Sequence, residues 1–521
     1  MTLIEVLKNT TDKFGDKQAI LFENESYTYK MLDGISSKLG WSLMELGINK
    51  GDRVAIFGPN CPEYLFAYFG IFKAGAAAIP VNAMLKGREI EYIITDCNPR
   101  ILFVHVSLLE VLLPVKERLF QCIEKFVVIG GTEAEYGDRF IRFEDLITER
   151  VQGTAGPGLG GDDMAMILYT SGTTGSPKGC ILRHESLVCS TEFSIKATGH
   201  QFSDKVLCCA PMFHIYGFSI SIASSIYPGA TMIIMDRFDP KKAIEVIKNH
   251  KINIFVGVPT MFTYLLKEPE IQSDDFKALR LNVSSGASLP IEVLSEFEKK
   301  FDTVIQEVYG ITESTGEAAY NPIEKRKPGS IGIPHSGLEL KIADERQGIV
   351  KTGEVGEIVI RGKSIMKGYW NKEAATREVL SEDGWYRTGD LARMDEDGYL
   401  YIVGRSKEMI ITGGFNIYPR ELEEVLYQHP DVHEAAVIGI PDKIKGELTC
   451  AFIVLHEGRK VEEEVLRSFC KERLANYKIP RMYRFVESLP KTETGKISKK
   501  DIQKQYKDIY TDNVRNGPER I

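Results

Sequence analysis

A loop from Tyr169 to Gly179, with the sequence YTSGTTGSPKG, contains residues suited to binding phosphate. Its glycines let the backbone bend so that several N–H groups converge on one anion, and its hydroxyls can donate further hydrogen bonds. Lys178 adds a full positive charge. The apolar segment MAMIL precedes the loop and predicts a buried strand. We therefore predict a phosphate site formed by Thr170, Ser171, Gly172, Thr173, Thr174, Gly175 and Lys178.

Two other interpretations of this loop are weaker. A Walker loop requires G-x-x-x-x-G-K-[ST], whereas Lys178 lies between Pro177 and Gly179, so the spacing excludes a P-loop NTPase. A flexible linker rich in glycine, serine and threonine would not place a strand directly before the loop and Pro-Lys-Gly directly after it. Phosphate binding remains the better explanation.

Further motifs follow the loop in order along the chain. They are PMFHIYG from Pro211, SSGASLP from Ser284, YGITES from Tyr309, TGD from Thr388, GRSKEMIITGGFNIYPRELE from Gly404 and PKTETGK from Pro490. With the loop, this set resembles the adenylate-forming superfamily of acyl-CoA synthetases, luciferases and peptide-synthetase adenylation domains. The earlier segment TYKMLDGISSKLGWSLMELGINKGDRVAIFGPNCPEYL resembles the first subdomain of that superfamily. The resemblance covers nearly the whole chain except the extreme C-terminus.

Thr312 and Glu313 of YGITES offer a hydroxyl for phosphate and a carboxylate for Mg²⁺, which binds through one or two carboxylates plus substrate phosphates. The resemblance implies these same roles. A Thr-Glu pair alone would more often cap a helix, but the accompanying motifs favour catalysis.

The resemblance also implies the rest of the ATP site. Asp390 and Arg405 match the pair that holds the ribose, with a surface salt bridge as the alternative. Glu307 departs from the pattern, because many relatives carry glutamine there. The adenine contacts implied are Gly286, Ala287, Glu307, Val308, Tyr309 and Gly310.

PMFHIYG indicates the kind of acid. Adenylation domains for amino acids place an aspartate at the position of His214, where it pairs with the substrate ammonium. This chain has no such anion there, so we expect an uncharged acid, of medium or long aliphatic chain or aryl type. The predicted acyl pocket comprises His214, Ile215, Tyr216, Phe218, Gly286 and Gly316.

The C-terminal motifs resemble those of a mobile domain. Lys407 matches a hinge about which a small domain rotates between two catalytic arrangements. Gly413, Gly414 and Phe415 resemble the loop beside the coenzyme A thiol arm, with an ordinary hairpin turn as the alternative. Lys496 of PKTETGK resembles the lysine that reaches the substrate carboxylate and α-phosphate.

The activity implied is an ATP-dependent acid:coenzyme A ligase, which forms an acyl adenylate with release of pyrophosphate and then a thioester with release of AMP. ATP, Mg²⁺ and coenzyme A are the expected substrates and metal activator, without a redox cofactor. Three alternatives stay open: an acyl-AMP ligase serving a carrier protein, a luciferase-like oxygenase, and an inactive acyl-adenylate binding module. Intact Lys178, Glu313, Asp390 and Lys496 argue against the last.

Apolar periodicity predicts alternating strands and helices, as in parallel sheets covered by helices. Asp239 and Pro240 begin one predicted helix, and residues 252–258 form the strand after it. The resemblance implies a large N-terminal domain, 1–404, of parallel-sheet α/β subdomains plus a β-barrel-like subdomain. A small α+β C-terminal domain, 405–521, follows the hinge. One helix of this domain is expected to bury Val465, Leu466, Phe469 and Leu474.

Composition restricts the function classes further. The 521 residues include 43% hydrophobic and 26% charged residues, as in a globular protein of more than one domain. A net charge of −8 argues against nucleic-acid binding. The nine cysteines contain no CxxC pair and suggest structural thiols in a reducing compartment. Without a targeting or transmembrane segment we expect a cytoplasmic location, and a homodimer is one assembly open to the chain.

Overall fold

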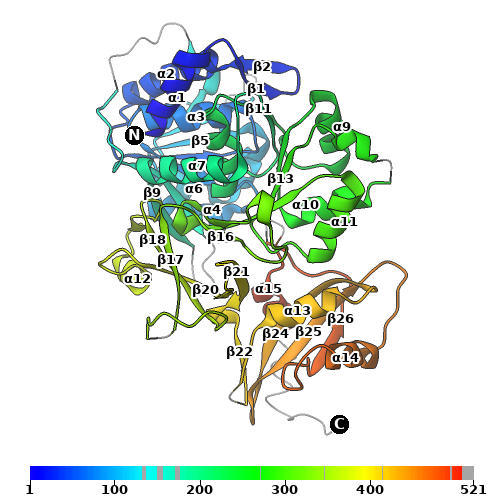
Figure 1. The fold of residues 1–521 in the computed structure, drawn as a ribbon. Coiled ribbons are helices and arrows are strands. Elements are labelled where there is room, and N and C mark those ends of the chain that lie inside the picture. The colour runs from blue at the N-terminus through cyan, green and yellow to red at the C-terminus, as the bar shows by residue number, and fades with distance from the viewer. Residues whose placement is uncertain are drawn as a thin grey trace.

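The computed structural model describes residues 1–131, 137–148, 156–170, 177–269, 271–344, 346–413, 415–492 and 496–506. Two large, mainly parallel sheets dominate the N-terminal part, and helices cover their faces (Figure 1). The helices are α1 (Leu3–Phe14), α2 (Tyr29–Glu45), α3 (Pro62–Lys73), α4 (Gly87–Cys97), α5 (Leu109–Leu112), α6 (Lys116–Cys122), α7 (His184–Thr198), α8 (Ser224–Ile226), α9 (Pro240–His250), α10 (Pro259–Lys267), α11 (Ile291–Phe301), α12 (Glu373–Val379), α13 (Pro419–Tyr427), α14 (Glu463–Lys471) and α15 (Lys499–Gln505).

The first large sheet has eight strands and carries the phosphate loop. In spatial order they are β19 (Gly368–Tyr369), β9 (Lys178–Arg183), β8 (Met164–Thr170), β4 (Ala77–Val81), β3 (Arg53–Phe57), β5 (Ile101–His105), β6 (Lys125–Ile129) and β7 (Phe140–Arg142). The strands from β4 to β7 pair in parallel, whereas β8, β9 and β19 form an antiparallel edge. The loop therefore joins two strands of a hairpin.

The second large sheet has nine strands and carries the YGITES motif. In spatial order they are β16 (Ile333–Pro334), β15 (Gly316–Tyr320), β14 (Ile305–Ile311), β13 (Leu281–Ser284), β12 (Ile254–Gly257), β10 (Lys205–Cys208), β11 (Thr231–Ile234), β1 (Gln18–Phe22) and β2 (Glu25–Thr28). Its central strands are parallel. The predicted helix begins at Pro240 as expected, where the Asp239 side chain accepts from the Lys242 N–H, and β12 follows it.

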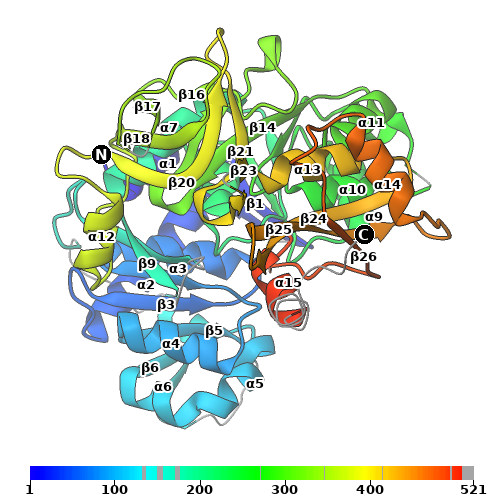
Figure 2. The ribbon, with the colours of Figure 1, turned by 90° about the horizontal axis from the view of Figure 1, so that it is seen from below.

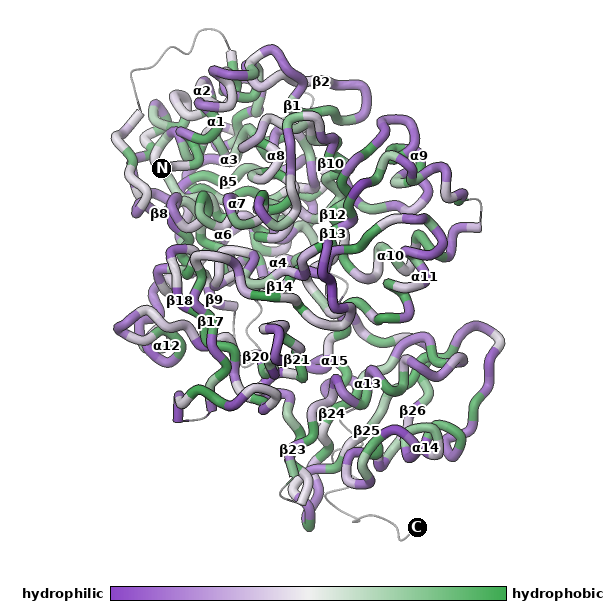
Figure 3. The backbone as a smooth tube through the Cα atoms, viewed as in Figure 1, coloured by the Kyte–Doolittle hydropathy of each residue, from purple (hydrophilic) through white to green (hydrophobic). Residues whose placement is uncertain are grey.

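Helix α3 is buried along almost its whole length, as a central helix must be. Lys73, the charge that interrupts this apolar segment, forms an ion pair with Asp33 at 2.6 Å and donates to Ser36 and Ser37. The charge is thus compensated inside the protein. Across the described ranges, no helix combines the length and apolarity needed to cross a membrane. Figure 3 shows hydrophobic segments concentrated inside the large sheets and hydrophilic ones on outer elements such as α9.

A third sheet follows in the chain. Where the sequence predicted a barrel-like subdomain, the structure has a four-stranded antiparallel sheet: β17 (Leu338–Ala343), β18 (Gly356–Gly362), β20 (Tyr386–Met394) and β21 (Leu400–Arg405). The predicted domain boundary falls at the end of β21.

The remaining strands form a small α+β unit below the large sheets (Figure 1). Its five strands are β23 (Phe415–Ile417), β22 (Ile410–Thr412), β25 (Gly446–Leu455), β24 (Val432–Asp442) and β26 (Met482–Phe485). Helices α13 and α14 contribute Leu422, Leu426 and Leu466 to its core. The prediction that Val465 points inward is wrong, because it is 49% exposed while Cys470, one turn beyond Leu466, is buried instead. The predicted α/β class with a smaller C-terminal unit is confirmed.

Candidate active site

The phosphate-loop hairpin is anchored at both ends. Thr170 and Lys178 lie opposite each other in the β8–β9 pairing. The Tyr169 hydroxyl donates to Asp96 at 2.6 Å, and Tyr92 of α4 donates to the carbonyl of Pro177 at 3.0 Å. The loop therefore leaves the sheet from two fixed points. The predicted contacts Ser171, Gly172, Thr173, Thr174 and Gly175 lie outside the described residues.

Glu313 and Lys178 come from different sheets and meet at one tyrosine. Thr312 and Glu313 form a short 3₁₀ turn directly after β14. The Tyr369 hydroxyl donates to Glu313 Oε1 at 3.0 Å, and the Lys178 ammonium lies over the Tyr369 ring, 4.9 Å from its centroid. Burial raises the pKa of Glu313, although the Tyr369 hydrogen bond and Arg405 favour the carboxylate.

Asp390 forms the centre of a second cluster. Its carboxylate pairs with Arg405 Nε at 3.0 Å and accepts from the Tyr309 hydroxyl at 2.6 Å. Asp390 is buried whereas Arg405 is about half exposed, with 7% and 46% of their side chains accessible. The two residues face each other across β20 and β21. The pair is thus more than a surface salt bridge, since its carboxylate is fixed at both oxygens.

The predicted adenine wall follows the ends of β13 and β14. Gly286 has φ +85°, a conformation that residues with side chains rarely adopt, and Ala287 beside it is exposed. Val308, Tyr309 and Gly310 belong to β14. At Gly310 an added β-carbon would lie 2.1 Å from a carbonyl oxygen of the facing strand, so only glycine fits.

Glu307, the departure from the family pattern, is buried in β14 and accepts from the Gly329 N–H at 3.3 Å. Burial raises its pKa to about 7, although the Gly329 hydrogen bond and the charges of Arg420 and Arg326 act in the opposite direction. Arg420 belongs to α13 of the small unit, so a charge of the small unit acts to lower the pKa of a carboxyl group in the large unit.

A pocket of about 680 Å³, counting the space at its mouth, opens beside these clusters. Its mouth includes Tyr264, which is 47% exposed. Its lining residues are Pro211, His214, Tyr216, Gly217, Phe238, Val258, Thr260, Met261, Tyr264, Gly286 and Lys496.

The polar end of this pocket carries His214 and Lys496. His214 Nδ1 accepts from the Tyr216 N–H at 3.2 Å, and burial together with the Lys496 charge lowers its pKa to about 4. The ring is therefore neutral near pH 7. Burial first, and then Arg405, lowers the pKa of Lys496 to about 8. Lys496 Cε would lie 3.8 Å from a β-carbon on Gly286, so the small unit reaches into the pocket of the large one.

Some predicted pocket residues lie elsewhere. Ile215 and Phe218, one turn apart where a helix passes into the π-helix Gly217–Ala223, face the hydrophobic core, and Phe218 packs on Tyr68 and Phe72. Gly316 faces the hydroxyls of Ser190 and Ser219, not the pocket lining. Their places are taken by Phe238, Val258, Met261 and Tyr264, which sequence reasoning missed because no motif contains them.

The predicted coenzyme A loop is remote from this pocket. Gly413 follows β22 and donates to the Lys445 carbonyl. Phe415 of β23 is 55% exposed and stacks on Tyr477. Figure 1 shows the β22–β23 hairpin at the end of the small unit farthest from the large sheets. Gly414 lies outside the described residues. Lys407 lies in a 3₁₀ turn directly after β21, between the two units. Figure 2 shows this junction from below, with β20 and β21 beside α13 and α15.

Two family models match the chain. The model described as AMP-binding enzyme matches residues 7–370, and the model described as AMP-binding enzyme C-terminal domain matches residues 421–496. The chain is 35% identical to the long-chain-fatty-acid–CoA ligase of Bacillus subtilis over 534 aligned positions, covering 96% of this chain and 94% of that protein.

Solved structures agree. The anthranilate CoA ligase AuaEII in complex with anthranoyl-AMP superposes with a TM-score of 0.90 at 29% identity, covering 97% of each chain. ATP-bound MatB from Rhodopseudomonas palustris gives 0.90 at 30% identity, covering 98% of this chain and 100% of that one, whereas apo MatB gives 0.80. The chain therefore belongs to the AMP-binding enzyme family, within the adenylate-forming superfamily of ligases.

Proposed function

We propose that the protein is an ATP-dependent acid:CoA ligase that activates an apolar carboxylic acid as its adenylate. The observation that carries this proposal is the convergence of Lys178, Glu313 and Asp390 from the large unit with Lys496 from the small one. Lys496 lines a largely apolar pocket and interacts electrostatically with Asp390. Asp390 also acts on Glu313, and Glu313 and Lys178 both contact Tyr369. Such a site fits an acid whose carboxylate faces a nucleotide and whose tail enters the pocket.

ATP would contact both large sheets. Lys178 and the loop from Thr170 would bind the β- and γ-phosphates, and Thr312 would donate to a phosphate oxygen. Asp390 and Arg405 would hold the ribose hydroxyls. Gly286, Ala287, Glu307, Val308, Tyr309 and Gly310 would enclose the adenine.

Glu313 is suited to Mg²⁺ because this ion needs few protein carboxylates when phosphates and water complete its shell. Consistent with that, the described residues contain no group of three or more metal-binding side chains, as a fully protein-bound site would require. Bound between Glu313 and ATP, the ion would neutralise charge on the departing pyrophosphate.

In the first half-reaction a carboxylate oxygen of the acid attacks the α-phosphorus in line, and the bond to the β-phosphate bridging oxygen breaks to release pyrophosphate. Lys496 would place its ammonium between the carboxylate and the α-phosphate, where two anions approach each other. Neutral His214 adds no competing charge beside the carboxylate.

In the second half-reaction the coenzyme A thiolate attacks the acyl carbon, and AMP leaves with the electron pair of the C–O bond. Gly413 and Phe415 are too remote to assist in the present arrangement. We propose that rotation at Lys407 brings their hairpin to the site and removes Lys496. The better superposition on ATP-bound than on apo MatB supports reading the present arrangement as the adenylating one.

The pocket favours an unsubstituted aliphatic or aryl acid. Phe238, Val258, Met261 and Tyr264 provide apolar surface, and no carboxylate is among the described residues that line the pocket. The named activities of the relatives, on long-chain fatty acids and anthranilate, cover the same two classes. We further propose that the protein is located in the cytoplasm, where ATP and coenzyme A are available. We also propose that it forms a homodimer.

One assay tests this function. Pyrophosphate release should depend on both ATP and an acid, peak with an apolar acid from a panel of chain lengths and aryl groups, and yield a thioester when coenzyme A is added. Pyrophosphate release without any thioester would redirect the assignment to an acyl-AMP ligase. Oxygen uptake on the adenylate would redirect it to a luciferase-like oxygenase.

A further inference from the structure

Tyr369 touches both halves of the phosphate site, yet the proposed mechanism gives it no role. Its hydroxyl donates to Glu313 Oε1 at 3.0 Å, and the Lys178 ammonium lies 4.9 Å from its ring centroid. The residue is only 8% exposed, so water competes weakly for either contact. One side chain thereby contacts two charged residues that are far apart in the sequence.

The backbone around Tyr369 is fixed to the same two elements. The Met366 N–H donates to the Glu313 carbonyl at 2.8 Å, and the Trp370 N–H donates to the Gly179 carbonyl at 2.7 Å. The Tyr369 N–H donates to Thr376 Oγ1 at 2.9 Å, which ties the residue to α12. The segment from Met366 to Trp370, which contains β19, is therefore hydrogen-bonded both to the Glu313 turn and to the phosphate hairpin.

We propose that Tyr369 is a positioning residue for both charges. Its hydroxyl restricts rotation of the Glu313 carboxylate so that the group is oriented for the metal, and its ring holds the Lys178 ammonium extended toward the phosphates. This inference rests on the proposed function, because it requires that Lys178 and Glu313 serve ATP and Mg²⁺.

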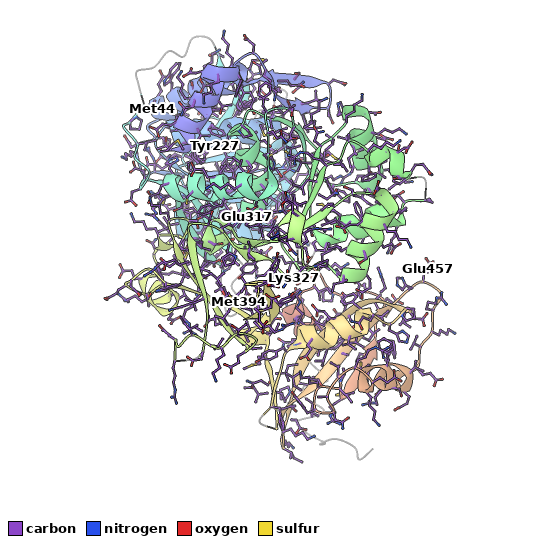
Figure 4. The ribbon with its side chains drawn as sticks, in the orientation of Figure 1. Met44, Tyr227, Glu317, Lys327, Met394 and Glu457 are labelled. Carbon is purple, nitrogen blue, oxygen red and sulfur yellow. The ribbon has the colours of Figure 1, made fainter. Side chains whose placement is uncertain are left out.

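Two substitutions separate the contacts. Tyr369→Phe keeps the ring under Lys178 and removes the hydrogen bond to Glu313. Tyr369→Leu removes both contacts but keeps an apolar side chain in the buried position. Tyr227→Phe is the matched control, because Tyr227 donates to Glu192 at 2.9 Å in a partly buried place. Figure 4 shows Tyr227 in the upper part of the large unit, away from the small one.

The test measures binding, so that it does not depend on turnover. Full-length protein is titrated with Mn²⁺ in the presence of α,β-methylene ATP, which cannot release pyrophosphate, and free Mn²⁺ is followed by electron paramagnetic resonance. Binding of the same nucleotide in EDTA is measured by calorimetry. Tyr369→Phe should weaken Mn²⁺ binding about tenfold, the loss expected for one hydrogen bond to a charged group. Its metal-free nucleotide affinity should match that of the wild type and of Tyr227→Phe.

Tyr369→Leu should weaken Mn²⁺ binding to the same degree and also lower metal-free nucleotide affinity roughly threefold, because the ammonium loses its support. Equal Mn²⁺ affinity of Tyr369→Phe, Tyr227→Phe and wild type would overturn the carboxylate role. Equal metal-free affinity of the Leu and Phe variants would overturn the lysine role. Because Tyr369→Phe changes only one hydroxyl, it decides the first point even if the Leu variant fails to fold. Absence of acid-dependent pyrophosphate release by the wild type would instead refute the proposed function.

Discussion

The phosphate side and the acyl side of the site are held in place differently. Glu313 and Asp390 each accept a hydrogen bond from a tyrosine of the large unit, Tyr369 for Glu313 and Tyr309 for Asp390. Lys496, by contrast, belongs to the small unit, where its backbone pairs with Thr492 while its side chain enters the pocket. The phosphate site is therefore formed within the large unit, whereas the small unit supplies the Lys496 charge.

The largest expected effect concerns the acyl side. Free amino acids should be poorer substrates than unsubstituted acids of equal length by about a thousandfold in kcat/KM, because burying an unpaired ammonium costs several kcal/mol. Near pH 7 His214 is neutral and offers no anion. Pyrophosphate release with matched pairs of acids checks this. Comparable turnover of both would mean that the pocket contains an acceptor that the described residues do not reveal.

The next effect separates the two units directly. Lys496→Ala should reduce acid-dependent pyrophosphate release by about a hundredfold or more, the scale of losing a transition-state charge contact. The same variant should still convert supplied acyl adenylate and coenzyme A to thioester.

Lys500→Ala, which removes an exposed lysine of α15 nearby, serves as the control and should leave both steps unchanged. Equal losses in both half-reactions by a folded Lys496→Ala protein would refute the idea that this lysine serves one arrangement only.

On the phosphate side, Glu313→Gln should raise the Mg²⁺ concentration needed for half-maximal adenylation and slow that step roughly tenfold, because the amide is a weaker ligand for a hard cation. Initial rates over a Mg²⁺ series, with the exposed Glu324→Gln as control, measure this. An unchanged Mg²⁺ dependence would assign Glu313 to structure alone.

The smallest effect is in the pH profile. The pKa of Lys496 is lowered to about 8 by burial, so its ammonium form dominates below pH 8 and is lost as the pH rises through that value. Adenylation should therefore fall about twofold between pH 7 and pH 8 and more steeply above it. Thioester formation from supplied adenylate should lack this decline. Lys496→Arg should move the decline to higher pH, and a decline shared by both steps would point to another group.

The charged residues could be proposed from sequence motifs because each lies in a short segment whose chemistry is local. The neighbourhood of Asp390 and Arg405 follows from two adjacent antiparallel strands. Lys496 lies in the short motif PKTETGK. Tyr369 escaped prediction because its contact with Glu313 depends on the pairing of a two-residue strand with β9. Nothing in the local pattern of Gly368 and Tyr369 signals that register.

The residues that line the acyl pocket were also difficult to predict from sequence, because they depend on how distant segments pack together. Ile215 and Phe218 belong to a motif, but the helical turn directs them into the core, whereas Phe238 and Tyr264 reach the pocket from segments without any motif. Packing between elements decides which apolar residues line a cavity, and periodicity identifies only that they are buried. The fold class could be predicted, because it depends only on the alternation of strands and helices along the chain.

The central claim is that a carboxylate oxygen attacks the α-phosphorus, and an oxygen-isotope experiment tests it most directly. The protein is incubated with ATP, coenzyme A and an apolar acid labelled with ¹⁸O in both carboxylate oxygens, and the nucleotide product is analysed by mass spectrometry. We expect AMP that carries one ¹⁸O atom, because cleavage of the acyl adenylate leaves one carboxylate oxygen on the phosphate. AMP without ¹⁸O, or ADP as the product, would contradict it.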